Sequence, residues 1–269
     1  MTKHPQIMIN IYKEPKLTKP ILIAAWPGIG NVALGAVSYL KEKLQAKEFA
    51  EIDPLPFFEP NGVIIEDNLI QHPKFPQNKF YYHKGKGRGK AKGNDLIILL
   101  GEAQPTSKTH DFANIILDLA QSFGVRQVYT FAAALIQNFA EKPRVWPAAT
   151  DMDLIRELES YGLVLKNDFY VAGMNGLLLS IAKERNMKGI CLLGETPRYL
   201  GEMGNPLASQ SILEVLNKIL RIEIDMTELE IMGQQAYKEI EKVIHEGRRD
   251  FIDRFTVPLW ERTEEEDKG

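Results

Sequence analysis

The chain of 269 residues lacks most of the features that identify a secreted, membrane-bound or disulfide-stabilised protein. Its one cysteine, Cys191, can form no internal disulfide, which indicates a reducing compartment. No uninterrupted apolar run approaches the roughly 20 residues of a membrane span, and residues 1–5 lead into no apolar segment of a signal peptide. We therefore expect a cytoplasmic protein with no membrane partner.

The charge balance and the absence of certain motifs argue against further classes of protein. The 33 basic residues nearly balance the 36 acidic ones, and the net charge of −3 produces no global field that attracts nucleic acid. The chain contains no H-E-x-x-H, C-x-x-C or G-x-S-x-G pattern, which are the patterns of zinc sites and of α/β-hydrolase nucleophiles. We expect no metal, no cofactor and no nucleic-acid partner.

What the sequence does contain is a repeated pattern in which a short apolar run breaks into a loop of Gly, Pro, Asn, Glu and Gln. The runs are 21–25, 96–100 and 190–193, and the loops that follow them are 26–31, 101–105 and 194–197. Loops at the carboxyl ends of parallel strands collect on one edge of an open α/β sheet, where ligands bind. The sequence therefore predicts a polar strand-end rim.

Strands and helices alternate along the chain. Apolar patterns predict strands at 21–25, 62–66, 79–82, 95–100, 127–134 and 189–193, of which 62–66 and 79–82 are expected to be antiparallel. Helices are predicted at 32–44, from Thr109 to a terminating Gly124, from an N-cap at Thr150, at 176–185, and from Asn205 with Pro206 at the first position. This alternation predicts an α/β fold, a mostly parallel sheet with helices on both faces.

The composition changes near Arg221, so we divide the chain into an α/β core, residues 1–222, and a C-terminal helical extension, residues 223–269. A capping-box-like start at residues 225–228 precedes a long helix, whose apolar stripe is Leu229, Met232, Ala236, Ile240, Val243 and Ile244. Two interpretations stay open: the helix folds back on its own core, or it mediates self-association. The acidic tail, residues 261–269, is predicted to be disordered.

The first polar loop contains a glycine fingerprint. Residues 28–33 satisfy G-x-G-x-x-[G/A] between a strand and a helix, where backbone amides bind a pyrophosphate, and Glu51 or Asp53 lies about 20 residues further on. Against this, Trp26 and Pro27 separate the strand from the glycines, and residues 49–54 make a poor second strand. Dinucleotide binding, another anion and a tight structural turn are the three interpretations.

Side chains on the later loops have two interpretations as well. Glu102, Gln104 and Glu195 provide carboxylates and an amide at strand ends, as a general acid or a ribose-binding site requires, or they hydrogen-bond loop amides. His110 stands at a helix start, where a cap or packing role is commoner than that of a base.

The basic loop 84–92 has five cations among flexible glycines, and we expect a solvated hairpin tip rather than a phosphate site.

The loops taken together resemble a known family. The segments that carry the resemblance are 26–33, 60–63, 101–105, 110–113, 123–125, 173–178, 191–197 and 205–206. In this order and combination they are similar to the archaeal and bacterial branch of the proteasome assembly chaperone family. The resemblance implies a three-layer α/β fold of the phosphorylase/hydrolase-like type, homo-oligomers, and binding of proteasome α-subunits in organisms that have them. Some members end in a hydrophobic-Tyr-any tripeptide, whereas this chain ends Asp267-Lys268-Gly269, so docking by that tripeptide is not expected.

Our leading hypothesis is a non-catalytic, oligomeric protein-binding module similar to the assembly chaperones. The alternative is an enzyme or sensor that binds a nucleotide- or nucleoside-like ligand on the strand-end rim. No loop carries a nucleophile, a base and an orienting group together, so no catalytic residue is named. The candidate ligand-binding residues are Gly28, Gly30, Asn31, Asn61, Glu102, Gln104, Asn175 and Glu195.

Overall fold

The computed structural model describes residues 8–60, 62–85, 93–138, 140–166, 168–201 and 203–256, with side chains described as far as residue 242. Three predictions fall outside the described residues. They concern Asn61, most of the basic loop 84–92, and the acidic tail 261–269.

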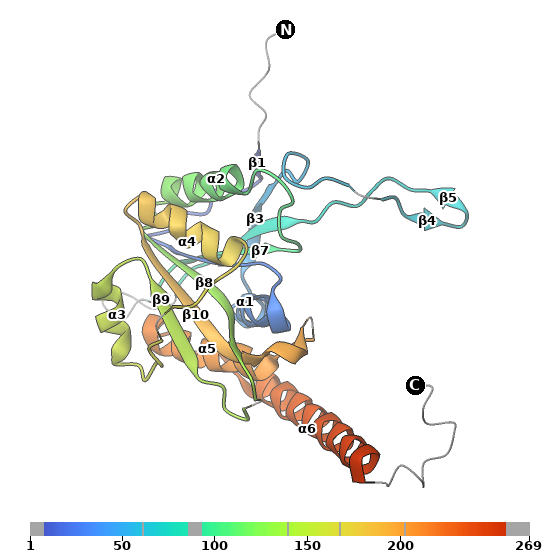
Figure 1. Cartoon of the computed structure of the whole chain (residues 1–269). Helices are drawn as coiled ribbons and strands as arrows, with labels where there is room; N and C mark the ends of the chain where they lie inside the picture. Colours follow the sequence, from blue (N-terminus) through green and yellow to red (C-terminus); the bar gives the residue numbers. More distant parts are fainter. Residues whose placement is uncertain are drawn as a thin grey trace.

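An eight-stranded sheet of the described residues forms the centre of the molecule (Figure 1). Its order is β1-β3-β6-β7-β2-β8-β10-β9, and the central strands β7, β2, β8 and β10 are parallel. The flanking pairs are antiparallel, so the sheet is mixed at its edges. The strands are β1 (Ile9–Ile11), β2 (Ile21–Ala25), β3 (Lys47–Ile52), β6 (Asn78–His83), β7 (Leu96–Gly101), β8 (Gln127–Ile136), β9 (Val145–Ala149) and β10 (Lys188–Pro197).

Helices cover both faces of the sheet (Figure 1). The helices α1 (Val32–Lys43), α3 (Met152–Glu159) and α5 (Pro206–Leu220) pack on one face, and α2 (Thr109–Ser122) and α4 (Met174–Glu184) pack on the other. Alternate residues of β2 enter the two cores: Ile23 faces α1 and α5, and Leu22 faces α2 and α4. This confirms the three-layer α/β architecture, in which central strands are apolar on both faces.

Local sequence patterns predict several strands and helices at the positions that the structure has. Strand β2 and helix α1 lie at the predicted positions, and α2 begins at Thr109. Asn205 is the N-cap of α5, where its side chain accepts a hydrogen bond of 3.2 Å from the Ala208 amide, and Pro206 follows at the first helical position. Gly124 has φ of +80°, as expected for the residue that ends α2.

Two predicted element boundaries are wrong. The N-cap of α3 is Asp151, whose carboxylate accepts from the Leu154 amide at 3.0 Å. Thr150 instead accepts a hydrogen bond from the Gly189 amide, which joins the end of β9 to β10. Helix α4 begins at Met174, two residues before the predicted start, because Gly173 with φ of +70° makes the entry turn.

Pairing corrects three strand predictions. Residues 194–197 form no loop, because β10 continues through them opposite residues 133–136 of β8. The sequence of residues 49–54 predicts a poor strand, yet most of this segment lies in β3, paired with β1 and β6. Of the predicted strand 62–66, only Ile65–Glu66 is a strand (β4), and it pairs with β5 (Leu69–Ile70) in a separate hairpin.

The C-terminal helix α6 (Thr227–Thr256) begins against the core. Leu229 and Ile240 are buried, and Lys43 of α1 forms an ion pair of 2.7 Å with Glu228. Met232, which the predicted apolar stripe includes, is 53% exposed. The helix then extends away from the sheet (Figure 1). Among the residues described, no helix is long and apolar enough to span a membrane.

Candidate functional site

The glycine fingerprint after β2 folds as a turn that is held from inside. Gly30 has φ of +64°, its amide donates to the Gly201 carbonyl at 2.7 Å, and its own carbonyl accepts from the Asn205 amide at 2.7 Å. The Asn31 amide donates to the Gly28 carbonyl at 2.9 Å. Two of the amides that an anion would require are therefore already engaged, which fits the structural-turn interpretation.

Asn175 fixes the same loop from the other side. Its carboxamide oxygen accepts from the Trp26 amide at 3.1 Å, and its NH₂ group donates to the Trp26 carbonyl at 3.2 Å. The Asn175 carbonyl in turn accepts from the buried Thr130 hydroxyl at 2.6 Å. Asn175 is 3% exposed, so these bonds replace water for buried backbone groups. The residue connects α4 to the end of β2.

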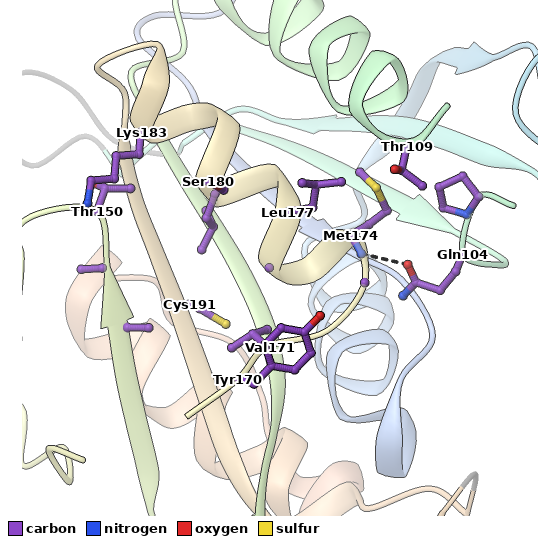
Figure 2. A pocket seen from close by; sticks show the side chains of 16 residues that line it. Gln104, Thr109, Thr150, Tyr170, Val171, Met174, Leu177, Ser180, Lys183 and Cys191 are labelled. Carbon is purple, nitrogen blue, oxygen red and sulfur yellow. Dashed lines mark hydrogen bonds between the residues drawn. The ribbon is translucent and has the colours of Figure 1, made fainter. Parts of the chain in front are cut away.

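Gln104 is a second connection between loops of the rim. Its amide nitrogen donates to the Pro27 carbonyl at 2.7 Å, and its oxygen accepts from the Met174 amide at 2.9 Å (Figure 2). A Cβ on Gly173 would lie 2.9 Å from the Gln104 carboxamide, so the glycine permits this approach. Gly28, Gly30, Gln104 and Asn175 are thus brought together, and Gln104 and Asn175 bind backbone.

Glu195 is buried beside a tryptophan and an arginine. Its carboxylate accepts from the Arg144 guanidinium at 2.7 and 2.9 Å, from the Arg144 amide at 3.1 Å and from the Trp146 indole at 3.0 Å. Burial alone would raise the pKa of Glu195. The hydrogen bonds from Arg144 and Trp146, together with the arginine charge, outweigh burial and lower that pKa below its ordinary value.

We expect Glu195→Gln to lower the free energy of unfolding by about 1–3 kcal/mol at neutral pH, because hydrogen bonds to a charged acceptor weaken. Since the folded-state pKa is the lower one, the stabilisation by Glu195 is complete above the unfolded value of about 4.3 and is lost as the pH falls through the folded value. Urea unfolding of both proteins from pH 7 to pH 3 measures this. A difference in stability that stays constant over this range would contradict the assignment.

Glu102 and His110 stand apart from this group. The Glu102 carboxylate accepts from the Gln77 amide at 2.9 Å, and the Glu102 amide donates to the Gln77 carbonyl at 2.9 Å. The His110 ring lies 2.9 Å from the Asn114 amide nitrogen, one turn further along α2. Glu102 therefore hydrogen-bonds a loop amide, which agrees with the structural interpretation of this side chain.

Two cavities of about 610 Å³ each flank the segment 170–173. The first, the α4 hollow, lies between α4 and the strands β9 and β10 (Figure 2). The second, the strand-end hollow, lies at the carboxyl ends of β2, β8 and β10. Its lining is mostly apolar: Pro27, Gly28, Ile29, Ala33, Gln104, Ala132, Ala133, Ala134, Leu135, Trp146, Phe169, Tyr170, Val171, Ala172, Gly173, Asn175, Leu193 and Arg198.

The α4 hollow contains a thiol that is poorly suited to nucleophilic chemistry. Cys191 lies beneath α4 in Figure 2 and is 1% exposed. Burial raises the pKa of its thiol to about 12, although a hydrogen bond with Thr130 acts in the opposite direction. The thiolate is the reactive form, so this cysteine behaves as a buried apolar residue, as the sequence predicted.

The sequence missed the aromatic residues of the strand-end hollow. Trp146 comes from β9, whose Pro147 argues against a strand, and Phe169 and Tyr170 come from an irregular segment. Tyr170 is 88% exposed and lines both hollows. Among the described residues, no group of three or more His, Cys, Asp and Glu side chains is placed to hold a metal ion.

The fold and the rim together define a three-layer α/β domain whose strand-end edge is hollow and mostly apolar, with Gln104 and Asn175 bound to backbone and Glu195 paired with Arg144. The chain belongs to the PAC2 family, whose model matches residues 22–244.

Similar proteins include three from archaea. The crystal structure of Pyrococcus furiosus PbaB, an archaeal proteasome activator, is 32% identical with a TM-score of 0.72 and covers 87% of this chain and 97% of that one. Pyrococcus furiosus PbaA, an archaeal homolog of proteasome-assembly chaperone, is 25% identical with a TM-score of 0.66 and covers 92% and 98%. The uncharacterized protein MJ1210 of Methanocaldococcus jannaschii is 29% identical over 86% of this chain and 84% of its own length.

Proposed function

We propose that this chain is a non-catalytic, homo-oligomeric protein-binding module that acts on the proteasome through its α-subunits, in the cytoplasm. The observation that carries the proposal is the character of the strand-end rim. Gln104 and Asn175 bind backbone, Glu195 is neutralised by Arg144, and the walls of the strand-end hollow are mostly apolar. Such an edge fits contact with protein better than acid-base chemistry.

The relatives support the choice of partner. PbaB is an archaeal proteasome activator and PbaA a homolog of a proteasome-assembly chaperone, and each of their solved chains is covered almost completely by this one. A surface that serves protein contact keeps exposed apolar side chains, and this chain has several at or near the rim. They include Ile29, Tyr170, Tyr199 and Met203.

We expect the purified full-length protein to form a defined oligomer in native mass spectrometry and to bind an immobilised archaeal 20S proteasome and its isolated α-subunits, but not its β-subunits. Bovine serum albumin on the same matrix controls for nonspecific apolar contact. Calorimetry against nucleosides, nucleotides and phosphate should remain silent. Nucleoside binding without any proteasome binding would instead support a ligand-binding enzyme or sensor.

A further inference from the structure

A hairpin arm leaves the body of the protein between β3 and β6 (Figure 1). Its tip is the pair β4 and β5, joined by the two-residue turn Asp67-Asn68. Both turn residues have positive φ, 51° and 64°, which is the type I′ geometry that matches the twist of a hairpin. None of the residues 62–74 is buried. The arm is therefore built as a hairpin but has no core of its own.

The tip of the arm is apolar. Val63, Ile65, Leu69 and Ile70 are 54%, 67%, 65% and 75% exposed, within eight residues of chain. An isolated two-stranded hairpin is at best marginally stable in water, and β4 and β5 are only two residues long each. A partner that covers these side chains would supply the missing stabilisation.

The arm and the strand-end hollow belong to the same edge of the sheet. Asn78, the first residue of β6, pairs with Gly101 at the carboxyl end of β7, and the hollow lies at the carboxyl ends of β2, β8 and β10. The arm points away from α3 and β9 (Figure 1). Because Trp146 of β9 lines the hollow, the arm points away from the hollow of its own chain.

The tip and the hollow complement each other in charge as well as in apolarity. Glu66 and Asp67 lie at the tip, where Lys74 is 3.9 Å from Glu66 in an exposed pair of the kind that contributes little. Arg198 lines the hollow, and the Lys166 ammonium lies 5.6 Å from the centre of the Trp146 ring. Apolar side chains flanked by carboxylates would thus meet aromatic and alanine walls flanked by cations.

We propose that the hairpin arm of one copy docks in the strand-end hollow of a second copy of this chain. The inference rests on the homo-oligomer of the proposed function and assigns its interface. Arm and hollow are different surfaces, so two closed arrangements satisfy the contact: reciprocal exchange of arms about a two-fold axis, or a head-to-tail ring whose rotation closes. The arm would occupy the strand-end hollow, whereas Tyr199 and Met203, which do not line the hollow, would stay available for a further protein contact.

Disulfide trapping tests the contact directly. One protein carries Ile70→Cys and another carries Tyr170→Cys, both at exposed positions, and the buried Cys191 remains unreactive. We expect an interchain disulfide when the two proteins are mixed and oxidised under native conditions. Each protein alone should form much less, and so should a mixture in which Met152→Cys on α3, 62% exposed, replaces Ile70→Cys.

Ile70→Glu should weaken the assembly at least tenfold, measured as the concentration at which light scattering shows half dissociation. Met152→Glu is the matched control, and Ile231→Glu, 53% exposed on α6, tests whether the helical extension forms the interface instead. A disulfide between two Ile70→Cys chains, or an oligomer that Ile70→Glu leaves unchanged, would overturn the inference while the proposed function stands. A wild-type protein that is monomeric and binds no proteasome would remove the proposed function itself.

Discussion

Asn175→Ala is expected to lower the free energy of unfolding by about 2–5 kcal/mol, because it leaves a buried donor and a buried acceptor of Trp26 without partners. Both Trp26 and Asn175 are almost completely buried, so water cannot easily replace the lost side chain. The truncation also removes both side-chain hydrogen bonds that connect Trp26, immediately after β2, to the start of α4. Chemical denaturation at neutral pH measures the change.

Asn10→Ala serves as the matched control. Asn10 lies on the edge strand β1 and is exposed, so removal of its side chain should change stability by no more than about 0.5 kcal/mol. If Asn175→Ala cost less than about 1 kcal/mol, a net value typical of one ordinary hydrogen bond, the two contacts with Trp26 would not be holding the rim together.

The same substitution connects stability with assembly. Residues 170–173, immediately before α4, separate the two hollows, and Met174 is held by Gln104. An Asn175→Ala protein that still folds should therefore have a disturbed strand-end hollow. We expect it to trap the arm of a second copy less efficiently than the wild type does.

The parts of the fold that sequence predicted are those that depend on neighbours along the chain. Strand β2 is apolar throughout, α1 has a helical stripe, and Asn205 with Pro206 marks the start of α5. Each signal acts over a few residues, which is why these elements lie where they were expected. Membership of the family was likewise indicated by short loops in a fixed order, and the match over residues 22–244 confirms it.

The parts that sequence missed depend on partners far along the chain. Gly194 and Glu195 have the composition of a loop, yet β9 pairs with β10 as far as Gly194 and β8 pairs with it as far as Pro197. Pro147 argues against a strand, but β9 lies at the edge of the sheet, where proline is tolerated. No local sequence pattern contains these strand pairings or the position of β9 in the sheet.

The candidate site shows the same division between features set by neighbouring residues and features set by residues far along the chain. Gln104 is a candidate because it follows a strand end, Asn175 is a candidate residue of the same rim, and the structure does bring the two together. Their hydrogen-bond partners, the backbones of Pro27 and Trp26, lie 77 and 149 residues away in sequence. Residue type could therefore predict polar groups at the rim but not that the protein itself occupies them.

Gly30→Val should lower the free energy of unfolding by about as much as Asn175→Ala, but for a different reason. The φ of Gly30 is +64°, a conformation that costs an L-residue about 1–2 kcal/mol and suits β-branched side chains least. A Cβ there would also lie 3.0 Å from a methyl of Thr196 and 3.2 Å from the Cβ of Asn205, and such overpacking typically costs about 1–3 kcal/mol. We expect a total loss of about 2–5 kcal/mol.

Gly204→Val is the matched control, because Gly204 has no positive φ and a Cβ there would meet no atom within 4 Å. Gly30→Ala should lie between the wild type and Gly30→Val, since it carries the backbone strain without the extra methyl groups. Denaturation of the three variants beside phosphate calorimetry separates a structural turn from an anion site. A Gly30→Val protein of unchanged stability that loses phosphate binding shown by the wild type would return the fingerprint to ligand recognition, whereas destabilisation with silent titrations assigns Gly30 to the architecture of the rim.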